Sequence, residues 1–201
     1  MKSKFALRLL SLCLLGLAGA PLALAHPGHG PAGGFAAGFA HPLGGWDHVL
    51  AMTAVGLWAA RLYARCLIPG AFLVMMTVGA VAGHWTGAVP GGEQFIAASV
   101  LAFGLLTADA VRLPSRVSIG LTGFFALFHG AAHGAEMPAT AAGLAYGAGF
   151  VAATILLMAA GVGLGELAGR KLARVPQFAG WVVAAAGAIL LALSFTPGTV
   201  H

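Results

Sequence analysis

The chain has 201 residues, of which 60% are hydrophobic and only 7% are charged. A soluble domain carries about 25% charged residues, so a soluble protein of this composition would expose a large apolar surface to water. The composition therefore excludes an ordinary soluble globular protein and favours a polytopic membrane protein. The formal net charge of +5 does not indicate a nucleic-acid-binding protein, because three of the ten basic residues lie in a predicted targeting segment: Lys2, Lys4 and Arg8.

Residues 1–25 have the three parts of a secretory signal peptide. A basic stretch ends at Arg8, and the apolar stretch that follows, residues 9–18, is too short to span a bilayer. Ala23-Leu24-Ala25 then has the small-x-small pattern of a cleavage site. We predict cleavage after Ala25, and an uncleaved membrane anchor is the alternative.

Cleavage would leave a short histidine-containing tail, residues 26–35, ahead of the apolar part of the chain. His26 would carry the free α-amine, and His29 follows closely, so both are candidates for accessory metal capture. A structureless tail is the alternative interpretation. Cys66 would be the one remaining cysteine, which excludes an intramolecular disulfide.

Six apolar stretches follow, each long enough for a membrane-spanning helix of about 20 residues. They cover residues 36–60, 66–86, 94–112, 117–135, 139–168 and 177–196. Pro42 lies inside the first stretch, where a proline kinks or breaks a helix. We therefore predict an all-α membrane protein, in which one six-helix transmembrane domain (36–201) follows the signal peptide. Two three-helix halves inserted in opposite directions would form a 3+3 inverted repeat, a plan found in transporters.

The basic residues outside the signal peptide predict the orientation of these helices. All seven fall in the links between spans 1 and 2, 3 and 4, and 5 and 6: Arg61, Arg65, Arg112, Arg116, Arg170, Lys171 and Arg174. These three links share one side of the membrane, and the positive-inside rule makes that side cytoplasmic. A cleaved signal peptide independently places the mature N-terminus outside, and six spans return the C-terminus to the same side.

Two short blocks place histidine and carboxylate side chains inside apolar stretches. The first block is residues 41–48, and the second is residues 128–136. Ionisable side chains at membrane depth are costly, and they usually line a pathway or a binding site. Histidine and carboxylate with little sulfur nearby are typical ligands of a divalent transition metal ion. The two blocks therefore predict a metal site, with six candidate ligands: His41, Asp47, His48, His129, His133 and Glu136.

Helical rise predicts how deep these ligands lie in the membrane. His48 precedes Arg61 by thirteen positions and His129 follows Arg116 by thirteen, so both imidazoles should lie about 20 Å from the basic side. Three residues at about 28–30 Å would form an outer ring: His41, His84 and Glu136. The sequence thus predicts an outer mouth and a deeper site along one route. His84 is an accessory candidate, and packing beside Trp85 is the alternative role.

The two blocks, His41-Pro-Leu-Gly-Gly-Trp-Asp47-His48 and Phe128-His129-Gly-Ala-Ala-His133-Gly-Ala-Glu136, resemble the motifs of the HupE/UreJ family. That family comprises bacterial nickel permeases, and in some members cobalt is the cargo. The likeness extends over the whole chain, including the signal peptide and the six spans. The family's motif residues correspond to the six candidate ligands named above.

The resemblance implies a permease of the bacterial inner membrane that imports Ni²⁺ from the periplasm, with both mature termini periplasmic. Nickel or cobalt would be the transported substrate, and no prosthetic group is expected. The implied partners are the metal ion, the lipid bilayer and metallochaperones or proteins that mature a hydrogenase or urease. No nucleic-acid partner is expected.

Three alternatives stay open at this point. A permease for cobalt or another divalent metal would use the same ligands, because nitrogen and oxygen donors do not separate these ions by affinity alone. An intramembrane zinc enzyme is disfavoured because the sequence has no HExxH motif, and a non-transporting subunit or sensor is the third alternative.

The sequence also has no ATP-binding P-loop, and Asp47 is its one deep acid. We therefore predict facilitated diffusion and no enzyme activity.

Overall fold

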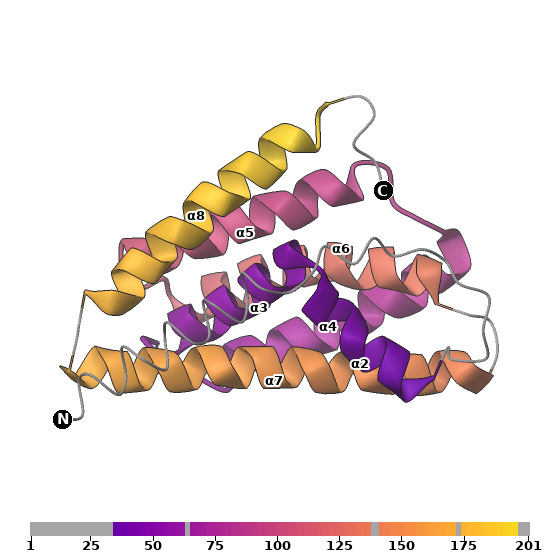
Figure 1. Cartoon of the computed structure of the whole chain (residues 1–201), viewed down its shortest axis with the longest axis horizontal. Helices are drawn as coiled ribbons and strands as arrows, with labels where there is room; N and C mark the ends of the chain where they lie inside the picture. The colour runs from indigo at the N-terminus through magenta and orange to yellow at the C-terminus, as the bar shows by residue number, and fades with distance from the viewer. Residues whose placement is uncertain (1–33, 63–64, 138–140, 172–173, 197–201) are drawn as a thin grey trace. The chain divides into compact units, whose positions relative to one another are not determined.

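The computed structural model of this chain describes residues 34–62, 65–137, 141–171 and 174–196, which form seven α-helices (Figure 1). The predicted signal peptide, His26 and His29 lie outside the described residues. The all-α prediction is confirmed for the described part of the chain. The helices are α2 (Phe35–Gly44), α3 (Trp46–Ala59), α4 (Leu67–Thr86), α5 (Gly92–Ala108), α6 (Ser115–Glu136), α7 (Ala141–Lys171) and α8 (Val175–Leu193).

The first predicted span is broken into two helices. Helix α2 ends at Gly44, Gly45 is extended (φ −99°, ψ 120°), and α3 starts at once with Trp46. Pro42 is buried within α2, so the break falls close to the proline but not at it. Asp47 lies in the first turn of α3, where the positive end of the helix dipole favours a carboxylate. The broken backbone therefore runs through the first histidine-containing block.

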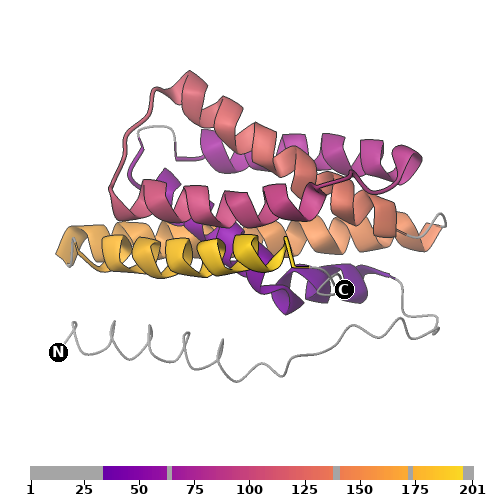
Figure 2. The same cartoon turned by 90° about the horizontal axis from the view of Figure 1, so that it is seen from above.

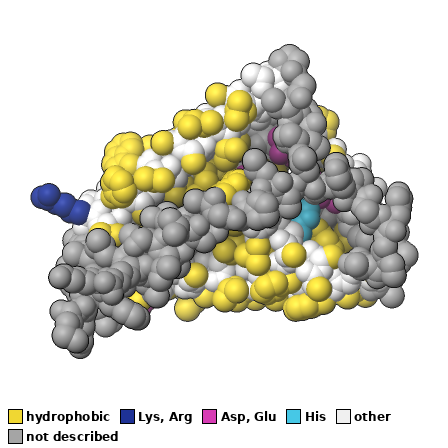
Figure 3. All heavy atoms as spheres, viewed as in Figure 1, with side chains coloured by type: hydrophobic (Ala, Val, Ile, Leu, Met, Phe, Trp, Pro, Cys, Tyr) yellow, Lys and Arg dark blue, Asp and Glu magenta, His cyan; other side chains and the backbone are white. Residues whose placement is uncertain are grey.

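Three helices are long and apolar enough to cross a membrane: α4, residues Ala142–Ala168 of α7, and α8. Helix α5 is apolar but shorter. Helix α6 has sufficient length at 22 residues, but its polar stripe lowers its hydropathy. Large apolar side chains are strongly exposed, for example Leu144 at 81% and Phe178 at 72%, and hydrophobic side chains cover much of the described surface in Figure 3. Contact with lipid would remove the cost of exposing so much apolar surface.

The helices pack in close groups: α4 with α6, α5 with α8, and α7 with both α2 and α3 (Figures 1 and 2). Glycines make this approach possible. A Cβ atom at Gly79 of α4 would overlap the backbone of Leu127 in α6, and one at Gly104 of α5 would overlap the backbone of Ala184 in α8. Gly56 of α3 lies in the same way against the backbone of α7.

Two of the basic links meet in the structure. Arg61 and Arg112 line one cavity of about 100 Å³ together with Ser115. The Arg65 guanidinium pairs with the Glu166 carboxylate of α7 at 2.5 Å. These contacts lie where α3 ends and α6 begins, whereas the histidines lie at the start of α3 and toward the end of α6.

Candidate metal site

Helix α6 presents its histidines and glycines on two different faces. His129 and His133 are four positions apart, so they stack on one stripe, and Gly130 and Gly134 form a second stripe rotated by about 100°. The glycine stripe packs against α4, where a Cβ at Gly130 would overlap the backbone of Met76. The histidine stripe therefore lies to one side of the α4 contact and reaches α3, where both rings pack near His48.

His48 of α3 meets His133 of α6 at the centre of the site. Their Nε2 atoms face each other in direct contact, and their ring centroids are 4.4 Å apart. Both residues are buried, each with 7% of its surface exposed. Two segments 85 positions apart in the chain thus bring ring nitrogens to one point.

Asp47 orients its neighbour His48. The Asp47 carboxylate accepts a hydrogen bond from Nδ1 of His48 at 2.7 Å and a second from the His48 backbone N–H at 2.9 Å. A carboxylate can only accept, so Nδ1 carries the proton and Nε2 keeps its lone pair. A carboxylate bound to the far nitrogen of a histidine is the usual support for a metal-binding imidazole.

His129 is the deepest of the histidines and is fully buried. Its ring centroid lies 5.2 Å from that of His48 and 5.6 Å from that of Phe72. Its Nε2 is hydrogen-bonded to Oγ of Ser99 in α5 at 2.9 Å. Its Nδ1 is buried and has no hydrogen-bond partner among the residues that the structure describes.

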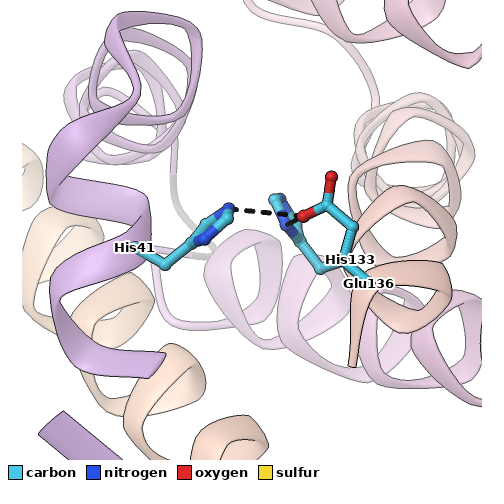
Figure 4. A group of neighbouring side chains, drawn as sticks. All are labelled: His41, His133 and Glu136. Atoms are coloured by element: carbon cyan, nitrogen blue, oxygen red, sulfur yellow. Dashed lines mark ion pairs between the residues drawn. The ribbon is translucent and has the colours of Figure 1, made fainter. Parts of the chain in front are cut away.

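The outer part of the site joins α2 to the end of α6 (Figure 4). Nε2 of His41 lies 3.8 Å from Oε2 of Glu136, and Nδ1 of His133 lies 3.9 Å from the same oxygen. One ligand atom from each of these three residues lies within 4.8 Å of the others. Side-chain exposure falls from 63% at Glu136 and 36% at His41 to 8% at His133, so this group leads inward from the surface.

All six candidate ligands from the two blocks are therefore brought together, in two overlapping groups. The outer group is His41, His133 and Glu136; the inner group is His48, His129 and His133, with Asp47 behind His48. His133 belongs to both groups. Of the three accessory candidates, His84 has its described ring contact with Trp85, at 5.6 Å, and His26 and His29 lie outside the described residues.

Several residues around the site were not predicted from the sequence. Phe150 of α7 lies 4.3 Å from the ring of His133, and Tyr146 lies 5.9 Å from that of His41. Both aromatic residues also line a cavity of about 350 Å³ beside His133, between α4, α6 and α7. Ser99 is the third residue near the site that the sequence did not predict. Neither it nor the two aromatic residues belong to a motif.

The side chains of the two groups carry donor atoms that can bind a metal cation. At least one ring nitrogen with a lone pair, Nε2 of His48, points into the inner group, where it contacts Nε2 of His133, and a carboxylate stands at the outer group. Neutral imidazole and carboxylate are the ligands that Ni²⁺, Co²⁺ and Zn²⁺ accept. A soft thiolate is absent from the described site, which disfavours a Cu(I) site.

The comparisons with known proteins agree with the resemblance seen in the two blocks. The sequence matches the family described as HupE / UreJ protein over residues 12–190. It is 45% identical over 166 residues to Protein HupE of Rhizobium leguminosarum bv. viciae, an alignment covering 80% of this chain and 85% of that relative. No solved structure matches the chain. The chain therefore belongs to the HupE/UreJ family.

Proposed function

We propose that this protein is a metal permease that carries Ni²⁺ from the periplasm across the bacterial inner membrane. The observation that supports this most directly is the pair of ligand groups that share His133. A resident structural metal ion is held by one closed set of ligands, whereas a transported ion needs successive sites that are close enough for transfer. Because the outer group is exposed and the inner group is buried, the ion would pass from the outer group to the inner group.

In this mechanism Glu136 and His41 capture the hydrated ion at the mouth. His133 then replaces part of its hydration shell, and the ion moves inward as the imidazoles of His48 and His129 replace more water. Asp47 contributes negative charge and holds His48 in the orientation that exposes Nε2. The order in which the residues bind the ion follows the fall in side-chain exposure from Glu136 and His41 to His133.

The packing of the helices supports the six-span architecture with a 3+3 inverted repeat. If α2 and α3 are counted as one broken span, the first half of the repeat ends with α5 and the second half begins with α6. Exchanging the halves converts the α4–α6 pair into the α7–α3 pair, and it returns the α5–α8 pair to itself. A pseudo-two-fold axis produces this pattern of contacts, and transporters with such repeats bind their substrate between the halves. In this proposal the basic links face the cytoplasm and both mature termini face the periplasm.

Nickel is the preferred cargo because of membership of the HupE/UreJ family. The imported ion would be delivered to a metallochaperone or to the proteins that mature a hydrogenase or urease. Cobalt is the second candidate, since nothing in a histidine and carboxylate site separates Co²⁺ from Ni²⁺ by affinity alone. Competition of ⁶³Ni²⁺ uptake by Co²⁺ and by Zn²⁺ would rank the three ions.

Single and double substitutions test whether the inner group acts as one site. We expect His48→Ala and His129→Ala each to reduce ⁶³Ni²⁺ uptake by roughly 10- to 100-fold, and the double variant to be little worse than either. The control is His84→Ala, which should transport normally because His84 lies against Trp85 and not in either ligand group. Losses that multiply in the double variant would contradict a shared site.

A further inference from the structure

Ser99 is placed to decide whether Nδ1 of His129 carries a proton or a lone pair. It lies in α5, where every side chain for several positions on either side is apolar or small, and it is fully buried. Its Oγ has two described polar neighbours: the backbone carbonyl of Ile96 at 2.7 Å and Nε2 of His129 at 2.9 Å. A serine hydroxyl has one proton and two lone pairs, so it cannot donate to both.

Two arrangements of protons are compatible with these distances. In the first, the Ser99 hydroxyl donates to the Ile96 carbonyl and accepts a hydrogen bond from Nε2–H of His129. In the second, the hydroxyl donates to an unprotonated Nε2, the oxygen of Ile96 receives no proton from it, and Nδ1 of His129 must carry the hydrogen. The two arrangements leave Nδ1 of His129 in opposite states, with a lone pair in the first and with an N–H in the second.

The surroundings favour the first arrangement. It makes two hydrogen bonds where the second makes one, and donation by serine to a carbonyl one helical turn back is common in buried helices. The second would also bury an N–H donor at Nδ1, which has no acceptor among the described residues, and buried donors without partners are rarer than buried acceptors without partners. The first arrangement leaves only a lone pair unpaired at Nδ1.

We infer that Ser99 is a positioning residue for metal binding, which holds His129 in its Nε2–H tautomer and so makes Nδ1 the ligand atom. His48 has the opposite tautomer because Asp47 accepts a hydrogen bond from its Nδ1. His129 therefore presents Nδ1 to the site, and His48 presents Nε2. This assignment rests on the proposed function, and it adds α5 to the helices that form the site. Ser99 takes, for His129, the part that Asp47 takes for His48.

The direct test is nitrogen NMR of the full-length mature protein, labelled with ¹⁵N-histidine and free of metal. The spectrum of His129→Gln assigns the His129 signals by difference. We expect a protonated Nε2 and an unprotonated Nδ1 at His129. A protonated Nδ1 at His129 in the unaltered protein would overturn the inference, and this outcome is read from the unaltered protein, with the variant used only for assignment.

The second test measures binding of Ni²⁺ to purified variants by calorimetry. Ser99→Ala should weaken binding about 10- to 100-fold, the usual cost of losing the partner of a metal-binding histidine, and should mix the tautomers of His129. Ser99→Thr keeps the hydroxyl and should restore both properties. The matched control is Ser118→Ala, a buried serine of α6 whose Oγ contacts the Leu113 carbonyl at 3.4 Å, and its affinity should be unchanged.

The two measurements separate the failure of this inference from the failure of the proposed function. If Ser99→Ala leaves both the tautomer and the Ni²⁺ affinity unchanged, Ser99 does not position His129. If the unaltered protein binds no Ni²⁺ while its His129 shows the Nε2–H tautomer, the positioning role holds and the proposed metal function fails.

Discussion

The histidine rings of the site lie against aromatic side chains. His133 packs 4.3 Å from Phe150, and His129 packs 5.6 Å from Phe72, measured between ring centroids. Water is therefore largely excluded from the inner group, and the attraction between a cation and its ligands is stronger there than in water. In the proposed mechanism, an entering ion exchanges its hydration shell for imidazole nitrogens, and the closeness of several histidines supports this role.

Proton competition for those nitrogens predicts the pH dependence of transport. Metal ions bind neutral imidazole, and histidine has an ordinary pKa of about 6.5. We expect the initial rate of ⁶³Ni²⁺ entry to fall as the pH is lowered, because protons compete with the metal ion for the ring nitrogens. The rate should be measured in proteoliposomes from roughly pH 5 to pH 8 with equal pH on both sides. A rate that rises on acidification would contradict binding by neutral histidines.

The types of the ligands and their spacing were predictable from the sequence, because histidine and carboxylate inside apolar stretches are conspicuous. The spacing argument put His48 and His129 at one depth, and their rings lie 5.2 Å apart. Ser99 was not predictable, since a single serine in an apolar helix is ordinary and its partner lies 30 positions away. His84 shows the reverse case, because its predicted depth matched the outer ring but its helix turns it toward Trp85.

At the scale of the helices, the positions of the histidines depend on glycines. Gly38 of α2 lies against the backbone of Tyr146 in α7, and this contact places His41, one turn later, over the aromatic side of α7. Gly83 of α4 lies in the same way against Ala131 of α6, next to the histidine stripe. Small residues that allow backbones to meet are the usual means of packing membrane helices.

Two glycines of α4 provide a matched test of this packing. Gly79→Ala would drive a methyl group into the backbone of Leu127, whereas the same change at Gly70 meets nothing within 4 Å. We expect Gly79→Ala to destabilise the protein by about 1–3 kcal/mol and to lower uptake, because α6 carries His129 and His133. Gly70→Ala should be neutral or slightly stabilising. Thermal unfolding in detergent compares them, and equal effects of the two substitutions would argue against the close α4–α6 contact.

The boundaries of the helices were only partly predictable. The break in the first span was expected from Pro42, but Pro42 lies within the last turns of α2 and the extended residue is Gly45, three positions later. The third span was expected to continue to Arg112, but α5 ends at Ala108, and Ala110 has a positive φ of 53°. Ala110 and Val111, between Asp109 and Arg112, are still apolar, so composition alone could not locate the turn.

At the scale of the whole molecule, the orientation in the membrane can be tested with the native cysteine. Cys66 is exposed and directly follows Arg65 in a link predicted to be cytoplasmic. In intact spheroplasts, Cys66 should react with a membrane-permeant maleimide but not with a charged, impermeant one. Thr86→Cys in a Cys66→Ser background should react with both maleimides, because the link that follows α4 faces the periplasm in the proposed topology. Labelling of Cys66 by the impermeant reagent would invert the proposed topology.

The charges of the whole molecule bear on how transport is driven. The described inner group holds one carboxylate, Asp47, which is paired with His48, whereas proton-coupled carriers commonly use a carboxylate that takes up and releases the proton. We therefore expect facilitated diffusion, drawn by metal-binding proteins in the cytoplasm. The membrane potential would add about 4.6 kcal/mol per 100 mV for a divalent cation.

The central claim is that this chain alone passes a divalent metal ion through its histidine groups. The most direct test is ⁶³Ni²⁺ entry into liposomes that contain only the purified mature protein, with an inward metal gradient and the potential clamped at zero. We expect entry well above that of protein-free liposomes, levelling at equal concentrations on both sides, and its loss in His129→Ala. Entry no faster than in protein-free liposomes, by a protein that still binds Ni²⁺, would contradict the claim and favour a non-transporting metal-binding subunit.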